Sequence, residues 1–195
     1  MLLGAAFGYY RQCMNPYRGT VQEFVSSRGM EERISRDEAE EDLTYLLKRL
    51  QERHPAWLDG SEDLVTAVEA QYDKEIAALG EELSVLELQR AAARIAAKLH
   101  DGHTYVAWRN ADEERFINDF TQMWAGRPVA IDGVPTEEIL RVYKETSSYE
   151  AEFYADEQFF GNSVVSENGL RLCGIDTSDG VVMTFEEDGK QVDYA

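Results

Sequence analysis

Residues 93–108 read ARIAAKLHDGHTYVAW, and the pattern of this stretch changes at Asp101 and Gly102. The residues before this pair have helical spacing, whereas the TYVAW that follows alternates in polarity as a strand does. We expect the Asp101 carboxylate to accept backbone amides in the turn and Gly102 to adopt the left-handed conformation. The stretch therefore predicts a helix-to-strand corner flanked by two of the chain's three histidines, His100 and His103.

Three amphipathic helices are predicted upstream of this corner. Ser35 to Glu38 and Ser84 to Glu87 have the S-x-x-E form of a capping box, whose hydroxyl and carboxylate satisfy free amides at a helix start. The first helix is expected to end before Pro55, because the residue preceding a proline avoids the helical region. Another helix is expected from about Ser61 to Leu79. Apolar side chains recur along each helix at helical spacing, so residues 35–103 are predicted to form a three-helix bundle.

The chain downstream of the corner mixes strands and helices. The stretch VAIDGVP predicts two short strands around an Asp132-Gly133 turn, followed by a helix capped by Thr136. The last residues predict a hairpin with Asp188-Gly189 at its tip. Three further helices are predicted, at residues 112–124, 149–160 and 164–172. The fold class is therefore α+β, a bundle followed by a mixed segment at 104–195 that ends on an uncovered hairpin, as an incomplete unit would.

The composition is that of an acidic protein with enough apolar material for a core. Its 38 acidic and 19 basic side chains give a net charge of −19, and 44% of the residues are hydrophobic. Such a surface repels phosphate groups, which argues against nucleic acid as a partner. Residues 1–34 are expected to be either an arm packed on the core or the trimmed end of a membrane anchor, because the opening apolar run is shorter than the ~20 residues of a span. Cys13 and Cys173 fit no metal or redox spacing, and the sequence leaves open whether they pair.

His103 is the candidate catalytic residue of the corner. A histidine on a tight turn has a fixed backbone and can project into a cleft. Its imidazole suits a general base, because it loses and regains a proton near neutral pH. The alternative is that His103 and Asp101 only close the corner. His100, on the last helical turn, is expected to be a favourable cation at the negative end of the helix dipole.

A metal-dependent function is a distant alternative. The sequence KLHDGH is partly similar to the HDIGH corner of HD phosphohydrolases, in which a His-Asp pair binds a divalent metal. That fold needs a further upstream histidine, for which His54 is the only candidate, and helix where TYVAW follows. We therefore predict no metal and no cofactor for this chain.

The remaining polar and aromatic groups are weaker candidates for chemistry. Runs of carboxylates at 38–42, 137–138 and 186–187 are expected to be solvated helix or strand faces. No activating base lies near Ser147, Ser148 or Ser178 in the sequence. Trp57, Trp108 and Trp124 are expected to anchor a core or an interface. Five positions are expected to shape turns: Asp101, Gly102, Thr104, Asp132 and Gly133.

Three segments follow one another in an order that resembles peptidase family S41, the family of the C-terminal processing peptidases and the tricorn-like serine proteases. They are EDLTYLLKRLQERHPAW, ARIAAKLHDGHTYV and VAIDGVPTEEIL. The resemblance covers about Glu41 to Leu140 and implies a helix ending in HP, a D-G-H-T corner and a PDZ-like segment around I-D-G-x-P. The stretch between Trp108 and Arg127 is shorter than in the family, and no PDZ carboxylate-binding loop is visible.

The resemblance implies a serine protease, a hydrolase that acts on polypeptides and whose nucleophilic serine lies in a later α/β domain outside these 195 residues. In the tricorn-like branch the position of His103 carries the general base, whereas a downstream lysine does so in the processing branch. The implied partners are a polypeptide substrate and the rest of the parent chain, and the implied location is extracytoplasmic or membrane-anchored. The chain would then position substrate and be inactive alone. The alternative is a non-catalytic module that binds peptides or a protein partner.

Overall fold

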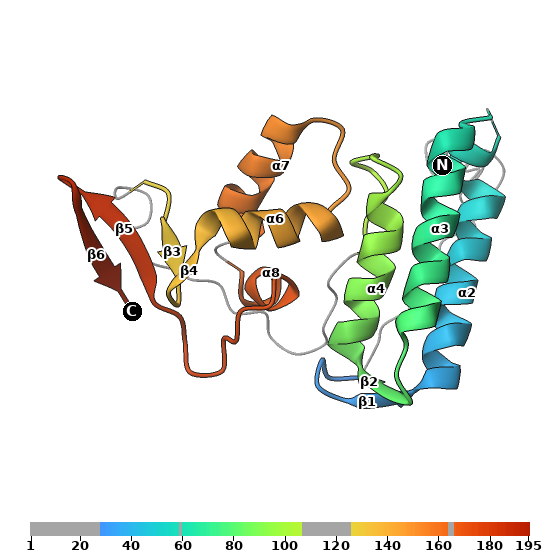
Figure 1. Ribbon diagram of the computed structural model, residues 1–195, viewed down its shortest axis with the longest axis horizontal. Helices are drawn as coiled ribbons and strands as arrows, with labels where there is room; N and C mark the ends of the chain where they lie inside the picture. The colour runs from blue at the N-terminus through green and yellow to red at the C-terminus, as the bar shows by residue number, and fades with distance from the viewer. Residues whose placement is uncertain (1–27, 59, 107–125, 164–165) are drawn as a thin grey trace, which may run out of the picture.

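The computed structural model describes residues 28–58, 60–106, 126–163 and 166–195. Three long helices stand side by side, and shorter helices and a four-stranded sheet lie on the far side of the third (Figure 1). The predicted α+β class is confirmed. None of the helices in the described ranges combines the length and the apolar character that a membrane crossing requires.

The three long helices are α2 (Arg36–Arg53), α3 (Glu62–Ala78) and α4 (Val85–Ala97). The helix preceding Pro55 ends at Arg53, as predicted, and a 3-10 turn, Pro55–Trp57, leads toward α3. One residue from each long helix shows how the predicted apolar stripes meet. Leu43, Val68 and Ile95 are almost completely buried in one cluster, so the predicted packing of the three helices is confirmed.

Both predicted capping boxes are present, and each follows a short strand that the sequence did not predict. Ser35 and Ser84 each exchange hydrogen bonds with the glutamate three residues later. The residues just before each helix pair as β1 (Arg33–Ser35) and β2 (Glu82–Ser84), antiparallel, with Ile34 opposite Leu83. This two-stranded sheet joins the start of α2 to the start of α4 beneath the helices (Figure 1).

The remainder of the chain forms a sheet with helices on it. Its elements are β3 (Ala130–Ile131), β4 (Val134–Pro135), α6 (Thr136–Thr146), α7 (Glu152–Gln158), a π-helical turn (Phe159–Ser163), α8 (Glu167–Leu172), β5 (Met183–Glu187) and β6 (Lys190–Tyr194). The strand order is β4-β3-β5-β6, and every pair is antiparallel. Both Asp-Gly turns are where they were predicted, with positive φ at Asp132, Gly133, Asp188 and Gly189. A second core lies between this sheet and its helices and contains Ile139, Phe159 and Phe185.

Several local predictions are wrong. Thr136 does not cap α6, because it is the first residue of the helix and its hydroxyl donates to the Pro128 carbonyl at 2.8 Å. Thr104 to Val106 form no strand, and the last two residues of TYVAW lie outside the described residues. The two late helices are shorter than predicted. The helix predicted at 112–124, together with Cys13, Trp108, Trp124 and most of residues 1–34, lies outside the described residues.

Helix α4 lies between the two cores, because it contributes to the first and packs against α6, which contributes to the second. Ile95 faces α2 and α3, whereas α6 packs against α4 from the other direction (Figure 1). Ala93, Ala96 and Ala97 are buried as well, and their small side chains let neighbouring helices approach from more than one side. The helix that carries the corner is therefore held from both sides, so its end has a fixed position.

Candidate functional site

The corner after α4 is formed where three loops meet at one end of the molecule. The chain reverses at His100, whose φ of 49° lies in the left-handed region. The loop between α6 and α7 lies beside it (Figure 1), and there Ser148 Oγ accepts the backbone amide of Asp101 at 3.0 Å. The third loop is the turn after α2, which begins at His54. Asp101 is the residue that all three loops share.

The prediction that Gly102 is left-handed is wrong, because His100 makes the reversal. After α4 the amides of Leu99 and His100 bond to carbonyls three residues back, at 3.1 and 3.2 Å, which tightens the chain into a narrow turn. The reversal is complete before Gly102, and a Cβ placed there would have its nearest contact at 4.0 Å, with Glu150 Oε1. The Asp101 side chain then closes the next turn without a positive φ at Gly102.

Asp101 accepts the backbone amide it was predicted to accept, and it accepts more. Its Oδ1 accepts the His103 amide at 2.9 Å, and its Oδ2 accepts the Thr104 hydroxyl at 2.7 Å. Its backbone carbonyl also accepts the Thr104 amide at 3.0 Å. The hydrogen bond from the His103 amide, followed by that from the Thr104 hydroxyl, lowers the pKa of Asp101 to about 2. The carboxylate is therefore ionised across the physiological range.

His103 presents its ring to solvent while one ring nitrogen faces this carboxylate. Its side chain is 92% exposed, and Nδ1 lies 3.3 Å from Asp101 Oδ1. When Nδ1 carries the proton, it donates to the carboxylate and leaves the Nε2 lone pair available to an incoming group. Nε2 has no hydrogen-bond partner among the described residues. A carboxylate behind an exposed imidazole can hold the ring in one tautomer and orientation, as in sites where histidine acts as a general base.

His54, expected only as a candidate ligand of the metal-dependent alternative, also lies at the corner. His54 closes α2 and starts the 3-10 turn, and its Nδ1 accepts the Ala56 amide at 3.2 Å. Its Nε2 lies 3.2 Å from Asp101 Oδ2, and its side chain is only 11% exposed. The HP and DGHT segments, far apart in the chain, therefore meet at Asp101. The only sequence signal for this contact was their joint appearance in the family pattern.

Ser148 and Tyr149 were also missed as parts of the corner, because both come from the distant loop between α6 and α7. Ser148 was considered only for its neighbours in sequence, whereas in the structure it fixes the Asp101 backbone. The ring of Tyr149 lies edge-on to His100, with centroids 6.0 Å apart. Of the two histidines flanking the turn, only His103 therefore faces the carboxylate.

One group of side chains near the corner has the residue types of a metal site. Asp101, His103 and Glu150 each have a ligand atom within 4.8 Å of the others. The Asp101 oxygens already accept hydrogen bonds from the His103 amide and the Thr104 hydroxyl, and they face the rings of His54 and His103, so hydrogen bonding accounts for the position of Asp101 without a metal. The arrangement proposed for HD enzymes also needs His100, whose ring lies against Tyr149. We propose no metal at this site.

The other predicted turn positions lie elsewhere. The Asp132-Gly133 turn joins β3 to β4, and Asp132 Oδ1 accepts the Val182 amide at 2.7 Å. Asp132 therefore stabilises the sheet and is not brought to the corner. Cys173 is a free, buried cysteine, and burial raises the pKa of its thiol to about 12. Such a thiol is un-ionised at neutral pH and is not a nucleophile.

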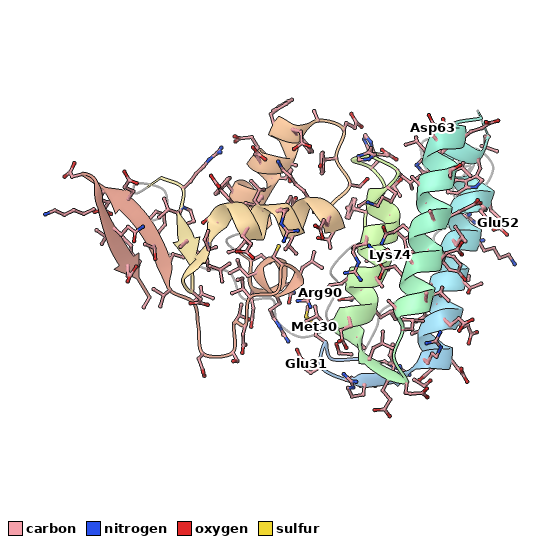
Figure 2. The ribbon with its side chains drawn as sticks, in the orientation of Figure 1. Met30, Glu31, Glu52, Asp63, Lys74 and Arg90 are labelled. Atoms are coloured by element: carbon pink, nitrogen blue, oxygen red, sulfur yellow. The ribbon has the colours of Figure 1, made fainter. Side chains whose placement is uncertain are left out.

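A cavity of about 600 Å³ lies between α4 and α8. Arg90 on its wall donates to the carbonyls of Leu172 at 3.0 Å and of Arg171, the last residues of α8. Arg171 is ion-paired with Glu31, and Glu31 and Arg90, both labelled in Figure 2, line the cavity. Glu167 and Asp176 also line the cavity, so the acids on its wall outnumber the arginines. Arg90 is thus accounted for as a contact that joins α4 to the negative end of α8.

No protein-family model matches the chain, and no curated protein matches it either.

Proposed function

We propose that His103 is the general base of an S41-like serine peptidase, and that this chain is the part of the enzyme that positions a polypeptide substrate. The nucleophilic serine is supplied by a segment outside these 195 residues. The observation that carries the proposal is the pairing of an exposed imidazole with an ionised carboxylate, His103 Nδ1 lying 3.3 Å from Asp101 Oδ1. The sequence likeness to the tricorn-like branch supports the same residue.

In this proposal His103 transfers one proton during acylation, from the serine hydroxyl to the leaving amine. His103 Nε2 takes the proton of the serine hydroxyl as its oxygen attacks the peptide carbonyl carbon, and the ring becomes an imidazolium. Asp101 accepts Nδ1–H and stabilises the imidazolium, and it stays ionised because its pKa is about 2. The imidazolium then gives its proton to the leaving amine nitrogen as the peptide C–N bond breaks.

The proposal also assigns a role to the rest of the chain. Residues 104–195 correspond to the PDZ-like segment, and the catalytic α/β domain follows it in the parent chain. The short β3–β4 turn with Asp132 and Gly133, followed by α6, supports this assignment because the family pattern has a helix after I-D-G-x-P. The partners are a polypeptide and the rest of the parent chain, which is extracytoplasmic or membrane-anchored.

The test is His103→Ala in the parent peptidase that carries the serine. Loss of a general base typically lowers the rate about 10²–10⁴-fold. The melting temperature should barely change, because the His103 side chain is 92% exposed. His100→Ala is the matched control, since it removes the other imidazole of the turn, which does not face Asp101. Normal turnover in the His103 variant with a lower melting temperature would contradict the proposal.

A second measurement addresses the location of the nucleophile. The 195-residue chain alone is expected to hydrolyse no peptide, because a base without a nucleophile forms no acyl-enzyme. Ser148 is the serine that the structure brings to the corner, where its oxygen contacts the Asp101 amide. Hydrolysis by the isolated chain that disappears in Ser148→Ala would place the nucleophile inside it and contradict this part of the proposal.

A non-catalytic binding module is the second candidate, and one observation favours it. Leu58, Tyr105 and Phe153 are 76%, 68% and 71% exposed, and side chains of this size supply apolar contact area to a partner when they lie in one patch. Tyr105 lies two residues after His103, so a peptide bound at the corner could contact it. Peptide binding that is lost in Tyr105→Ser, together with full turnover in the His103→Ala parent, would favour the binding module.

A further inference from the structure

The tautomer of His54 follows from its two hydrogen bonds. Nδ1 lies 3.2 Å from the Ala56 amide nitrogen, and an amide can only donate, so Nδ1 is the acceptor. In the neutral ring the proton is then on Nε2, which lies 3.2 Å from Asp101 Oδ2. His54 therefore donates Nε2–H to the carboxylate that faces His103.

The end of α2, the following 3-10 turn and the ring of Trp57 determine the position of the Nε2–H donor. His54 is both the C-cap residue of α2 and the N-cap residue of the 3-10 turn Pro55–Trp57, so its backbone is fixed on both sides. Its ring packs edge-on against Trp57, with centroids 6.1 Å apart, and its side chain is 11% exposed. A nearly buried ring with both nitrogens engaged has little freedom to turn away from Asp101.

The two oxygens of Asp101 divide their partners between them. Oδ2 accepts the Thr104 hydroxyl and faces His54, whereas Oδ1 accepts the His103 amide and faces the His103 ring. Of these partners, His54 comes from the end of a different helix, α2, and lies 47 positions from Asp101 in the chain. It therefore ties the carboxylate to the helical bundle, which His103 and Thr104, in the same turn as Asp101, cannot do.

We infer that His54 is a positioning residue, which acts on His103 through Asp101 and never touches the reacting atoms. By holding Oδ2 it keeps Oδ1 directed at Nδ1 of His103, and it thereby selects the tautomer whose Nε2 lone pair is free. Its catalytic meaning rests on the proposed function of His103. The hydrogen-bonded arrangement itself does not, and it is measurable in the 195-residue chain.

The first experiment needs no substitution. Nitrogen-15 spectra of the histidine rings in the wild-type chain distinguish a protonated nitrogen from an accepting one. We expect His54 to be protonated at Nε2 with Nδ1 as acceptor, and neutral His103 to be protonated at Nδ1. A His54 ring that carries its proton on Nδ1, or that exchanges freely between tautomers, would overturn the inference.

The second experiment compares two substitutions of His54. His54→Leu keeps the bulk and removes the donor, whereas His54→Gln keeps an N–H donor at a similar reach. In the leucine variant we expect the Asp101 pKa to rise, because a hydrogen bond to its charged form is lost. We also expect His103 to lose its preference for the Nδ1-protonated tautomer. The glutamine variant should retain both properties, and Arg53→Leu, an exposed change at the same helix end, is the matched control.

A purely structural role for His54 makes a different forecast. Such a role would lower the melting temperature of the leucine variant and leave both the His103 tautomer and the Asp101 titration unchanged, and that result would overturn the inference. In the parent peptidase, the leucine variant should lower kcat with little change in KM, and the glutamine variant should recover it. The proposed function fails on a separate result, normal turnover in His103→Ala, so the two failures are distinguishable.

Discussion

At the scale of single residues, the Asp101 carboxylate couples the corner to pH. Its pKa is about 2 in the folded chain, against about 3.9 when unfolded. A group whose pKa is lower in the folded state stabilises the fold above its unfolded pKa and loses this contribution as the pH falls through its folded pKa. The contribution of Asp101 is therefore complete at neutral pH and is lost between about pH 5 and pH 2.

We predict that Asp101→Asn lowers the free energy of unfolding at pH 7. The difference between the variant and the wild type should become smaller as the pH approaches 2. The pKa difference corresponds to at most about 2.6 kcal/mol, and to less here because the side chain is 30% exposed. Denaturant unfolding of both proteins at pH 7, 5, 4, 3 and 2 measures the effect. A difference in the free energy of unfolding that stays constant across this series would contradict the pKa assignment.

The turn itself allows a test of which residue is left-handed. We predict that Gly102→Ala changes the free energy of unfolding by no more than about 0.5 kcal/mol, because the nearest atom to the new Cβ would be 4.0 Å away. His100→Gly should relieve a left-handed cost of about 1 kcal/mol, partly offset by loss of the ring contact with Tyr149. Thermal unfolding of both variants is the measurement. A large loss of stability in Gly102→Ala, together with unchanged stability in His100→Gly, would support the original prediction that Gly102 is the left-handed residue.

The corner was predictable from its own residues and not from its distant partners. Asp101 was expected to bond to nearby amides, because an aspartate in a turn reaches the amide two residues on. His54 and Ser148 each lie 47 positions from Asp101, and no local rule gives the packing that brings them there. The left-handed His100 was missed for a related reason, since glycine is the default for that conformation and its neighbour is a glycine.

At the scale of helices and strands, the two predicted capping boxes, which depend on hydrogen bonds within a single helical turn, were confirmed. Both capping boxes formed, because their serine and glutamate satisfy amides within the same turn. Thr136 failed as a cap because it is the first residue of α6 and its hydroxyl donates to the carbonyl of Pro128, in the loop before β3. The β1–β2 pair is only three residues long on each side and has no turn between its strands, so nothing in the sequence marks it.

Helices α3 and α4 are joined by a buried ion pair that the apolar pattern could not reveal. Glu75 is 6% exposed in its side chain, and Arg94 contacts its two oxygens from Nε and Nη2 at 2.7 and 2.6 Å. Gln71 donates to the same carboxylate at 2.5 Å. Because every acceptor of this kind must be satisfied when buried, removal of one partner leaves the others with an unpaired charge.

We predict that Glu75→Ala lowers the free energy of unfolding by about 3 kcal/mol, toward the low end for a buried pair because Arg94 is 32% exposed. The double variant Glu75→Leu with Arg94→Leu should recover much of this loss, since it leaves no buried charge. Asp73→Ala, an exposed change on the same helix, is the control. Urea unfolding of the four proteins gives the energies. Equal losses in the single and double variants would show that the ion pair itself stabilises the fold.

At the scale of the whole molecule, one helix joins two cores whose residues are far apart in sequence. Leu43 belongs to the core of the three long helices, and Ile139 on α6 belongs to the core beneath the sheet. Between them stands α4, covered on both sides, with Arg90 bonded to the carbonyl end of α8 (Figure 2). The sequence predicted a bundle at 35–103 and a separate mixed segment. The spacing of the large apolar residues marks one face of α4, and it does not show that the alanines on the other face are also buried.

This arrangement predicts that the described parts of the chain unfold in a single transition. Helix α4 contributes Ile95 to the core of the long helices and packs against α6, which contributes Ile139 to the other core, so detachment of α4 would disrupt the first core and uncover one side of α6. Leu43→Ala and Ile139→Ala should each cost about 2–5 kcal/mol, because both side chains are 1% exposed. Each should lower one shared melting transition, and each should speed amide exchange in α3 and in β5 alike. Lys48→Ala, exposed on α2, is the control. If Ile139→Ala instead speeds exchange in β5 while α3 keeps its protection, α4 does not couple the two cores, and the corner after it is held by the helical bundle alone.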